Sequence, residues 1–142
     1  MLKRAFEYED YNGVNRTEDA YFNLSEAEVL EMEAGTSGGF VEMLDRIVAS
    51  QDAPSIMREF KKIILKAYGQ KRDDGKQFIK SEELSQAFSQ TPMYTQLFME
   101  LALNADAASA FVHGILPKNM GEIMAKYAGG NQQKPAEIEK GA

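Results

Sequence analysis

Two helix starts in close succession constrain the fold of this chain more than any other feature. Ser81 stands before two acidic residues, an N-cap followed by charges that suit the positive end of a helix dipole. Thr91 and Pro92 repeat the signal, because threonine can cap a helix and proline at the first helical position loses no hydrogen bond. The pattern predicts one helix over about residues 82–90 and a second that begins at Pro92.

The second of these helices carries an apolar stripe. Large apolar residues recur at the i, i+3, i+4, i+7 spacing of one helix face, at Tyr94, Leu97, Phe98 and Leu101. Such a stripe packs against a core or against a partner. We prefer the core, and we keep Tyr94, Phe98 and the neighbouring Met99 as candidate partner-binding residues.

Similar signals predict the rest of the helices. They lie at about residues 25–34, 40–50, 54–68, 105–116 and 120–127. Thr36-Ser37-Gly38-Gly39 lacks the lysine of a phosphate-binding loop, so it is interpreted as a connector between helices. Asp74-Gly75 predicts a tight turn, because the carboxylates that a calcium loop needs at its other positions are missing.

The N-terminus has a different period. Leu2, Arg4, Phe6 and Tyr8 alternate with other residues, which favours a strand, and Asn12-Gly13 favours a turn before a second strand near residues 20–23. An isolated hairpin is marginal in water, so it must lie on the helices or on another copy. The fold class is therefore mainly α: a compact multi-helix domain over residues 1–128, with an N-terminal β-hairpin at about residues 2–24. Residues 129–142 are polar and aperiodic, which predicts a disordered, flexible tail.

Composition excludes several classes of function. The chain has 142 residues, which suits one domain, and it has no cysteine, which excludes disulfides and thiolate chemistry. His113 is the only histidine, so a typical zinc site is not expected, and no catalytic motif or cofactor motif accompanies it. No apolar run is long enough to cross a bilayer, and the N-terminus does not resemble a signal peptide. These features predict a cytosolic protein that is not an enzyme and holds no metal or cofactor.

Charge is unevenly distributed along the chain. Residues 1–45 hold three basic and eleven acidic residues, a net charge of −8, whereas residues 58–80 hold eight basic and three acidic residues, a net charge of +5. These blocks could pair within the fold, pair neighbouring copies in a homo-oligomer, or present the basic block to an acidic partner. The helix over residues 54–68 is amphipathic, with an apolar stripe at Ile56, Phe60, Ile63, Ile64 and Ala67. Its Lys61, Lys62 and Lys66 are candidate partner-binding residues. The simpler interpretation is a core helix with a solvated lysine face.

Methionines are a further candidate for partner contact, because their flexible side chains adapt to different surfaces. We prefer core packing for them, with surface roles kept open for Met93, Met99, Met120 and Met124.

A set of residues in the second half of the chain resembles the tail assembly chaperones of long-tailed bacteriophages. The resemblance covers about residues 22–116 and is carried by Tyr68-Gly69, Asp74-Gly75-Lys76, Phe78-Ile79-Lys80-Ser81-Glu82-Glu83, Phe88, Thr91, Tyr94 and Phe98-Met99-Glu100-Leu101. It implies a protein of the infected host cytoplasm that holds the tape measure protein soluble while tail tube subunits polymerise, and that is absent from the mature virion. It also implies a longer frameshifted product that contacts the major tail protein.

Two other functions remain open from the sequence. One is a structural tail-completion or connector protein that stays in the virion. The other is a regulator that binds nucleic acid through residues 58–80, although the net charge of −6 and the lack of a helix-turn-helix pattern argue against it.

Overall fold

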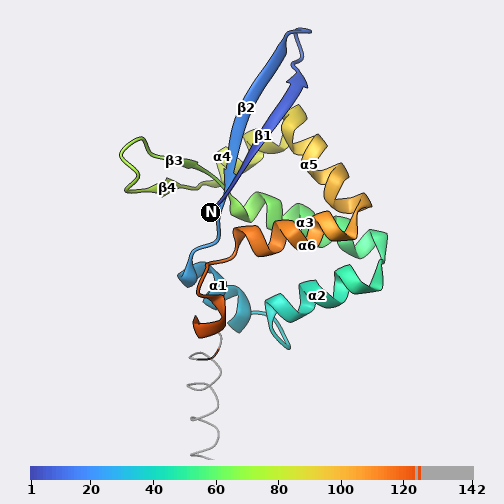
Figure 1. Cartoon of the computed structure of the whole chain (residues 1–142), viewed down its shortest axis with the longest axis vertical. Helices are drawn as coiled ribbons and strands as arrows, with labels where there is room; N and C mark the ends of the chain where they lie inside the picture. Colours follow the sequence, from blue (N-terminus) through green and yellow to red (C-terminus); the bar gives the residue numbers. More distant parts are fainter. Residues whose placement is uncertain (124, 126–142) are drawn as a thin grey trace, which may run out of the picture.

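The computed structural model describes residues 1–123 and residue 125 (Figure 1). Its elements are β1 (Leu2–Glu9), β2 (Asn15–Phe22), α1 (Glu26–Ala34), α2 (Phe40–Ser50), α3 (Ala53–Ala67), β3 (Tyr68–Lys71), β4 (Phe78–Ile79), α4 (Glu82–Ser89), α5 (Pro92–Leu103) and α6 (Ala105–Ile115). The chain turns helical again at Met120. A mainly α fold with an N-terminal hairpin is thus confirmed. The predicted tail over residues 129–142 and the end of the last predicted helix lie outside the described residues.

The predicted N-cap residues start their helices. The side chains of Ser81, Thr91 and Asn104 each accept a backbone N–H of the first turn of α4, α5 and α6. Ser25 and Glu28 form the complete capping box at α1. Local sequence therefore sets the helix boundaries in the second half of the chain.

The second strand of the first hairpin is longer than predicted. β1 and β2 pair along their whole length, from Leu2 opposite Phe22 to Glu9 opposite Asn15, whereas the second strand was expected only near residues 20–23. Asp10 explains the difference, because its Oδ1 accepts the N–H groups of Asn12 at 2.8 Å and Val14 at 2.9 Å. The closed loop lets both strands continue to the tip.

A second hairpin was not predicted. The helix expected to end at Tyr68 ends at Ala67, and β3 and β4 stand on either side of the predicted turn. They extend the sheet to four antiparallel strands in the order β1-β2-β3-β4. Gly69 permits the close pairing. A Cβ there would lie 2.6 Å from the Phe78 ring and 2.8 Å from the Ile79 carbonyl oxygen. Asp74-Gly75 forms the predicted turn, with Gly75 at a φ of +74°.

Phe22 lies at the centre of the core. Its ring is fully buried and meets the rings of Tyr68, Phe88 and Phe111 edge-on, with centroids 5.9, 5.6 and 5.4 Å away. The last residue of the hairpin therefore joins the sheet to the helices. The predicted stripe of α3 is part of the same core, and all of it is buried, at Ile56, Phe60, Ile63, Ile64 and Ala67.

The outer half of the first hairpin projects from the helices (Figure 1). Near its base the hairpin is held to α5, where Gln96 donates to the Glu7 carbonyl oxygen at 3.0 Å and Arg4 pairs with Glu100. At the tip, Tyr11 and Val14 are 83% and 52% exposed. One end of the hairpin therefore packs against the helices, and the other end is exposed to solvent.

Candidate functional site

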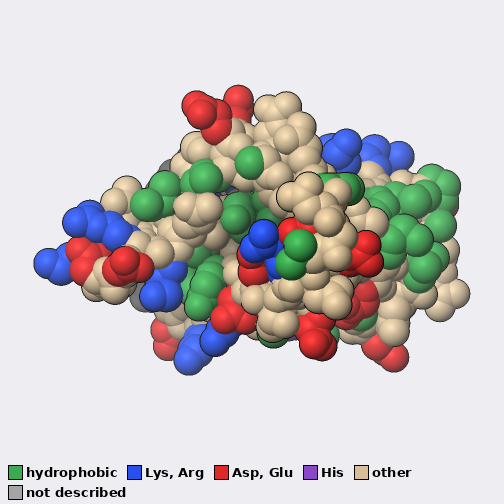
Figure 2. Space-filling view, turned by 90° about the horizontal axis from the view of Figure 1, so that it is seen from above, with side chains coloured by type: hydrophobic (Ala, Val, Ile, Leu, Met, Phe, Trp, Pro, Cys, Tyr) green, Lys and Arg blue, Asp and Glu red, His purple; other side chains and the backbone are tan. Residues whose placement is uncertain are grey.

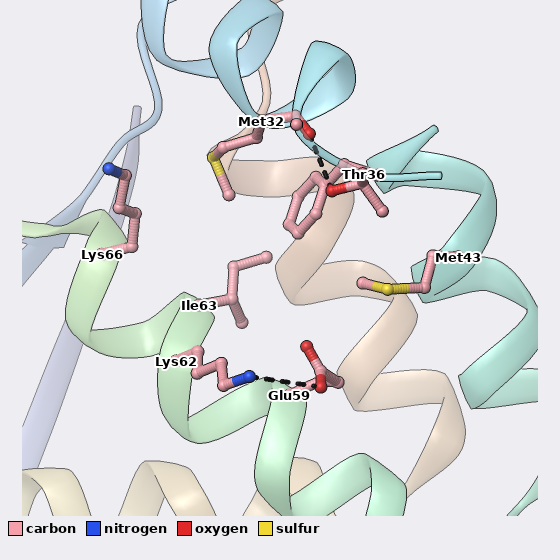
Figure 3. A pocket seen from close by; sticks show the side chains of 9 residues that line it. Met32, Thr36, Met43, Glu59, Lys62, Ile63 and Lys66 are labelled. Carbon is pink, nitrogen blue, oxygen red and sulfur yellow. Dashed lines mark hydrogen bonds and ion pairs between the residues drawn. The ribbon is translucent and has the colours of Figure 1, made fainter. Parts of the chain in front are cut away.

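Three helices enclose an open groove of about 480 Å³ on the surface of the molecule (Figure 3). The groove is lined by the C-terminal end of α1, by the first turn of α2 and by the outer side of α3. The lining divides into an apolar floor and a polar rim. The floor consists of Met32, Phe40, Met43 and Ile63, and the rim consists of Gly35, Thr36, Glu59, Lys62 and Lys66.

The connector between α1 and α2 fixes the shape of this groove. Gly39 has a φ of +93°, and no side chain at that position caps α2. The cap comes instead from Glu33, which is only 7% exposed and accepts the Val41 N–H at 2.8 Å. A Cβ at Gly39 would lie 2.6 Å from Glu33 Oε2, so only glycine leaves room for this contact. The glycine pair thus forms the predicted connector and holds α1 against α2.

The Thr36 hydroxyl and the Glu59 carboxylate of the groove already have partners. The Thr36 hydroxyl donates to the Met32 carbonyl oxygen at 2.8 Å. Glu59 lies 3.6 Å from both Lys62 Nζ and Arg58 Nε. The surface offered to a ligand in the floor is therefore apolar, and methionine side chains give that floor freedom to adapt.

Lys62 and Lys66 form a ridge between this groove and a second hollow. They also line the second hollow, of about 470 Å³, whose other side includes Glu28 and Lys80. Lys80 Nζ donates to Glu28 Oε1 and Oε2 at 2.9 and 2.8 Å and to the Asn23 carbonyl oxygen at 2.6 Å. Among the described residues, this is the one ion pair that joins the acidic N-terminal block to the basic block.

The electrostatics of the pair reflect its partial burial. Burial alone raises the pKa of Glu28, but hydrogen bonds from Lys80 and from Ser25 outweigh it, so the pKa lies below its ordinary value. The pKa of Lys80 is lowered, first by burial and then by repulsion from Lys66, although the contact with Glu28 opposes the shift. The lowered Lys80 pKa therefore reflects burial that the contact with Glu28 does not fully offset.

One comparison with known proteins identifies a family for the chain. A family model described as phage tail assembly chaperone matches residues 1–140. The chain belongs to this family. The match extends beyond residues 22–116, over which the resemblance was expected, and includes the first hairpin. No curated protein and no solved structure matched the chain. Membership implies a non-enzymatic role in assembly, in the host cell, in interaction with tail proteins.

The chaperone's fold separates the partner-binding residues predicted from sequence. Lys62 and Lys66 line the groove, whereas Lys61 is exposed on α3 outside its lining. The others lie on α5. Tyr94 and Phe98 stack with centroids 5.8 Å apart and are partly buried against the core, while Met99 is 49% exposed. The predicted set therefore forms two surfaces, not one.

The sequence did not indicate that four residues of the groove, which make up its floor, form a site. Phe40 and Met43 were recognised as one helix face and Ile63 as part of the α3 stripe, but nothing in the sequence joined them to Met32. The methionines proposed for surface roles lie elsewhere: Met93 and Met120 are partly buried, and Met124 lies outside the described residues. The glycine pair was the available signal, because a tight connector brings α1 and α2 together.

Two further findings concern the described part of the chaperone. Its residues contain no group of His, Asp and Glu side chains placed to hold a metal ion, and His113 is exposed. None of its helices is both long and apolar enough to span a membrane. Residues 58–80, considered above for nucleic acid, form most of α3 and the second hairpin.

Proposed function

We propose that this chaperone binds the tape measure protein of its phage, keeps it soluble, and assists polymerisation of the tail tube around it. The observation that carries the proposal is the family match over residues 1–140. A tape measure protein is long and helical, and it exposes apolar faces before the tube covers it. A small protein that shields such faces must itself expose apolar surface.

The chaperone has exposed apolar surface in two places. One is the groove floor described above, where Met32 and Met43 are only partly buried. The other lies at the end of the molecule where α3 begins and α5 ends, where Met57 and Leu103 are 40% and 77% exposed. Figure 2 shows hydrophobic side chains gathered at that end. Exposed apolar patches of this kind mark interaction sites more often than scattered single residues do, and they support a role in binding.

The proposal includes the fate of the chaperone. It acts in the cytoplasm of the infected host and leaves before the virion matures, and a longer frameshifted product brings the major tail protein to the complex. Mass spectrometry of purified particles tests the first part, because a tail-completion protein would be found there. The gene sequence near the last codons tests the second part through the presence of a slippery site.

Co-expression tests the central function. The chaperone is expressed with the tape measure protein encoded near it, and the soluble fraction of the tape measure protein is compared with that obtained without the chaperone. We expect the chaperone to raise the soluble fraction and to copurify with the tape measure protein. If the two proteins do not copurify and neither changes the other's solubility, the proposal is wrong.

A further inference from the structure

The groove between α1, α2 and α3 is poorly suited to a compact anion despite its lysines. In Figure 3 the Lys62 ammonium points toward Glu59, whereas the Lys66 ammonium points away from it. The Thr36 hydroxyl is already engaged, and the Glu59 carboxylate would repel an anion. No set of donors among the groove residues converges on one point, so a ligand must be extended and must carry its charges apart.

The spacing of the two lysines matches a helix. Lys62 and Lys66 are one turn apart on α3, a rise of about 6 Å. Carboxylates at i and i+4 on a second helix are separated by the same rise, and such residues lie on one face. On an amphipathic helix, large apolar residues lie beside these carboxylates. Such a helix is complementary to a groove that has an apolar floor and a basic rim.

The charge on the ridge is not balanced within the fold. Glu59 is shared between Lys62 and Arg58, and Glu28 is the carboxylate that pairs with Lys80. Lys66 forms no ion pair with any described residue. Within the described part of the chain, Lys66 is therefore the lysine of the ridge without a paired carboxylate, and an acidic side chain of a ligand would be attracted to it.

We propose that the groove binds one amphipathic helix of the partner, which places apolar side chains over Met32 and Met43 and sets carboxylates one turn apart against Lys62 and Lys66. The inference rests on the proposed function, because the helix is a segment of the tape measure protein. It adds which surface of the chaperone binds, and it adds the secondary structure and the charge pattern of the segment that this surface recognises.

Peptide binding tests the inference. Fluorescent peptides of about 30 residues, tiled along the tape measure protein, are titrated with the full-length chaperone by fluorescence polarisation. The peptides that bind should have acidic residues one turn apart beside an apolar stripe. The double substitution Lys62→Glu with Lys66→Glu should weaken their binding about tenfold or more, because two attractive contacts become repulsive. Met43→Trp should weaken it as well, by filling the floor.

Lys61→Glu is the matched control, since it makes the same change on the same helix outside the groove. It should bind as the unmodified chain does, and thermal melts should show that all variants remain folded. A peptide whose acidic pair is replaced by lysines should regain binding to the double variant, which a purely structural effect of the substitutions would not produce.

Three results would overturn the inference. Equal binding by the double variant, Met43→Trp and the control would leave the proposed function intact and remove the groove from it. Loss of self-association in the groove variants, without any peptide binding, would assign the groove to a second copy of the chain. If no peptide binds and the unmodified chain fails to solubilise the intact tape measure protein, the proposed function fails too.

Discussion

Helix α3 faces two different surroundings, and the contrast separates stability from binding. Its inner side places Phe60 and Ile64 in the core, where neither is exposed. Its outer side presents Lys62 and Lys66 to solvent beside a groove whose methionines are only partly buried. The inner side is fully buried, and the outer side is lined by flexible side chains. Substitutions on the two sides should therefore change different measurements.

The largest expected effect lies in the core, at Phe22. Phe22→Ala removes a ring with no exposed surface that contacts three other rings, and it should lower the free energy of unfolding by about 3–5 kcal/mol. That is a large part of a typical total of roughly 5–15 kcal/mol. Chemical denaturation measures the change. Tyr11→Ala at the exposed hairpin tip is the control and should stay within about 0.5 kcal/mol.

A smaller loss of stability is expected at the second hairpin. Gly69→Ala places a methyl group 2.6 Å from the Phe78 ring and 2.8 Å from a backbone oxygen, so β3 and β4 must move apart. Such overpacking costs about 1–3 kcal/mol. Urea titration compares it with Gln70→Ala, an exposed neighbour on the same strand. Equal stability of the two variants would show that the hairpin does not need the close approach.

Phe98 tests the boundary between the two kinds of surface. If the stripe faced the core fully, as preferred from the sequence, Phe98→Ala would lower the free energy of unfolding by about 3–5 kcal/mol. The side chain is partly buried on Tyr94, so Phe98→Ala should cost about 1–2 kcal/mol and leave tape measure solubilisation unchanged. Thermal melts and the co-expression assay are made on the same variant, with Met99→Ala as its exposed neighbour. Unchanged stability with lost solubilisation would move the binding surface to α5.

The smallest effect concerns the ion pair beside the ridge. The pKa of Glu28 is lowered in the fold, so its contribution is present above the ordinary value of about 4.3 and is lost as the pH falls through the lowered value. Lys80 stays protonated throughout this acidic range. The difference in unfolding free energy between the unmodified chain and Glu28→Gln should therefore be constant from about pH 7 to 5 and shrink below that. Glu31→Gln, an exposed change on the same helix, should show no such trend.

Sequence predicted the elements whose signals are local. Caps at Ser25, Ser81 and Thr91 and the buried stripe of α3 depend on neighbouring residues, and the structure has them where they were expected. The second hairpin depends on the fit between Gly69 and Phe78, which lie apart in the chain. Neither hydrophobic periodicity nor a capping residue indicates that fit, so the second hairpin was not predicted.

The candidate site was less predictable than the fold for a related reason. A lysine on a helix face is recognisable from its spacing, and Lys62 and Lys66 were named. Whether a face borders a groove depends on what packs next to it, here the turn at Gly39 and the buried Glu33. Tyr94 and Phe98 have the helical spacing that a partner-binding stripe would also have, but they lie partly buried against the core.

Hydrogen–deuterium exchange of the chaperone with and without the tape measure protein tests the separation of stability from binding most directly. Amides of residues 32–43, which form the end of α1, the connector and the start of α2, are measured against those of residues 94–99 on α5. The account predicts slower exchange over residues 32–43 in the complex and no change over residues 94–99. Slower exchange confined to residues 94–99 would contradict it.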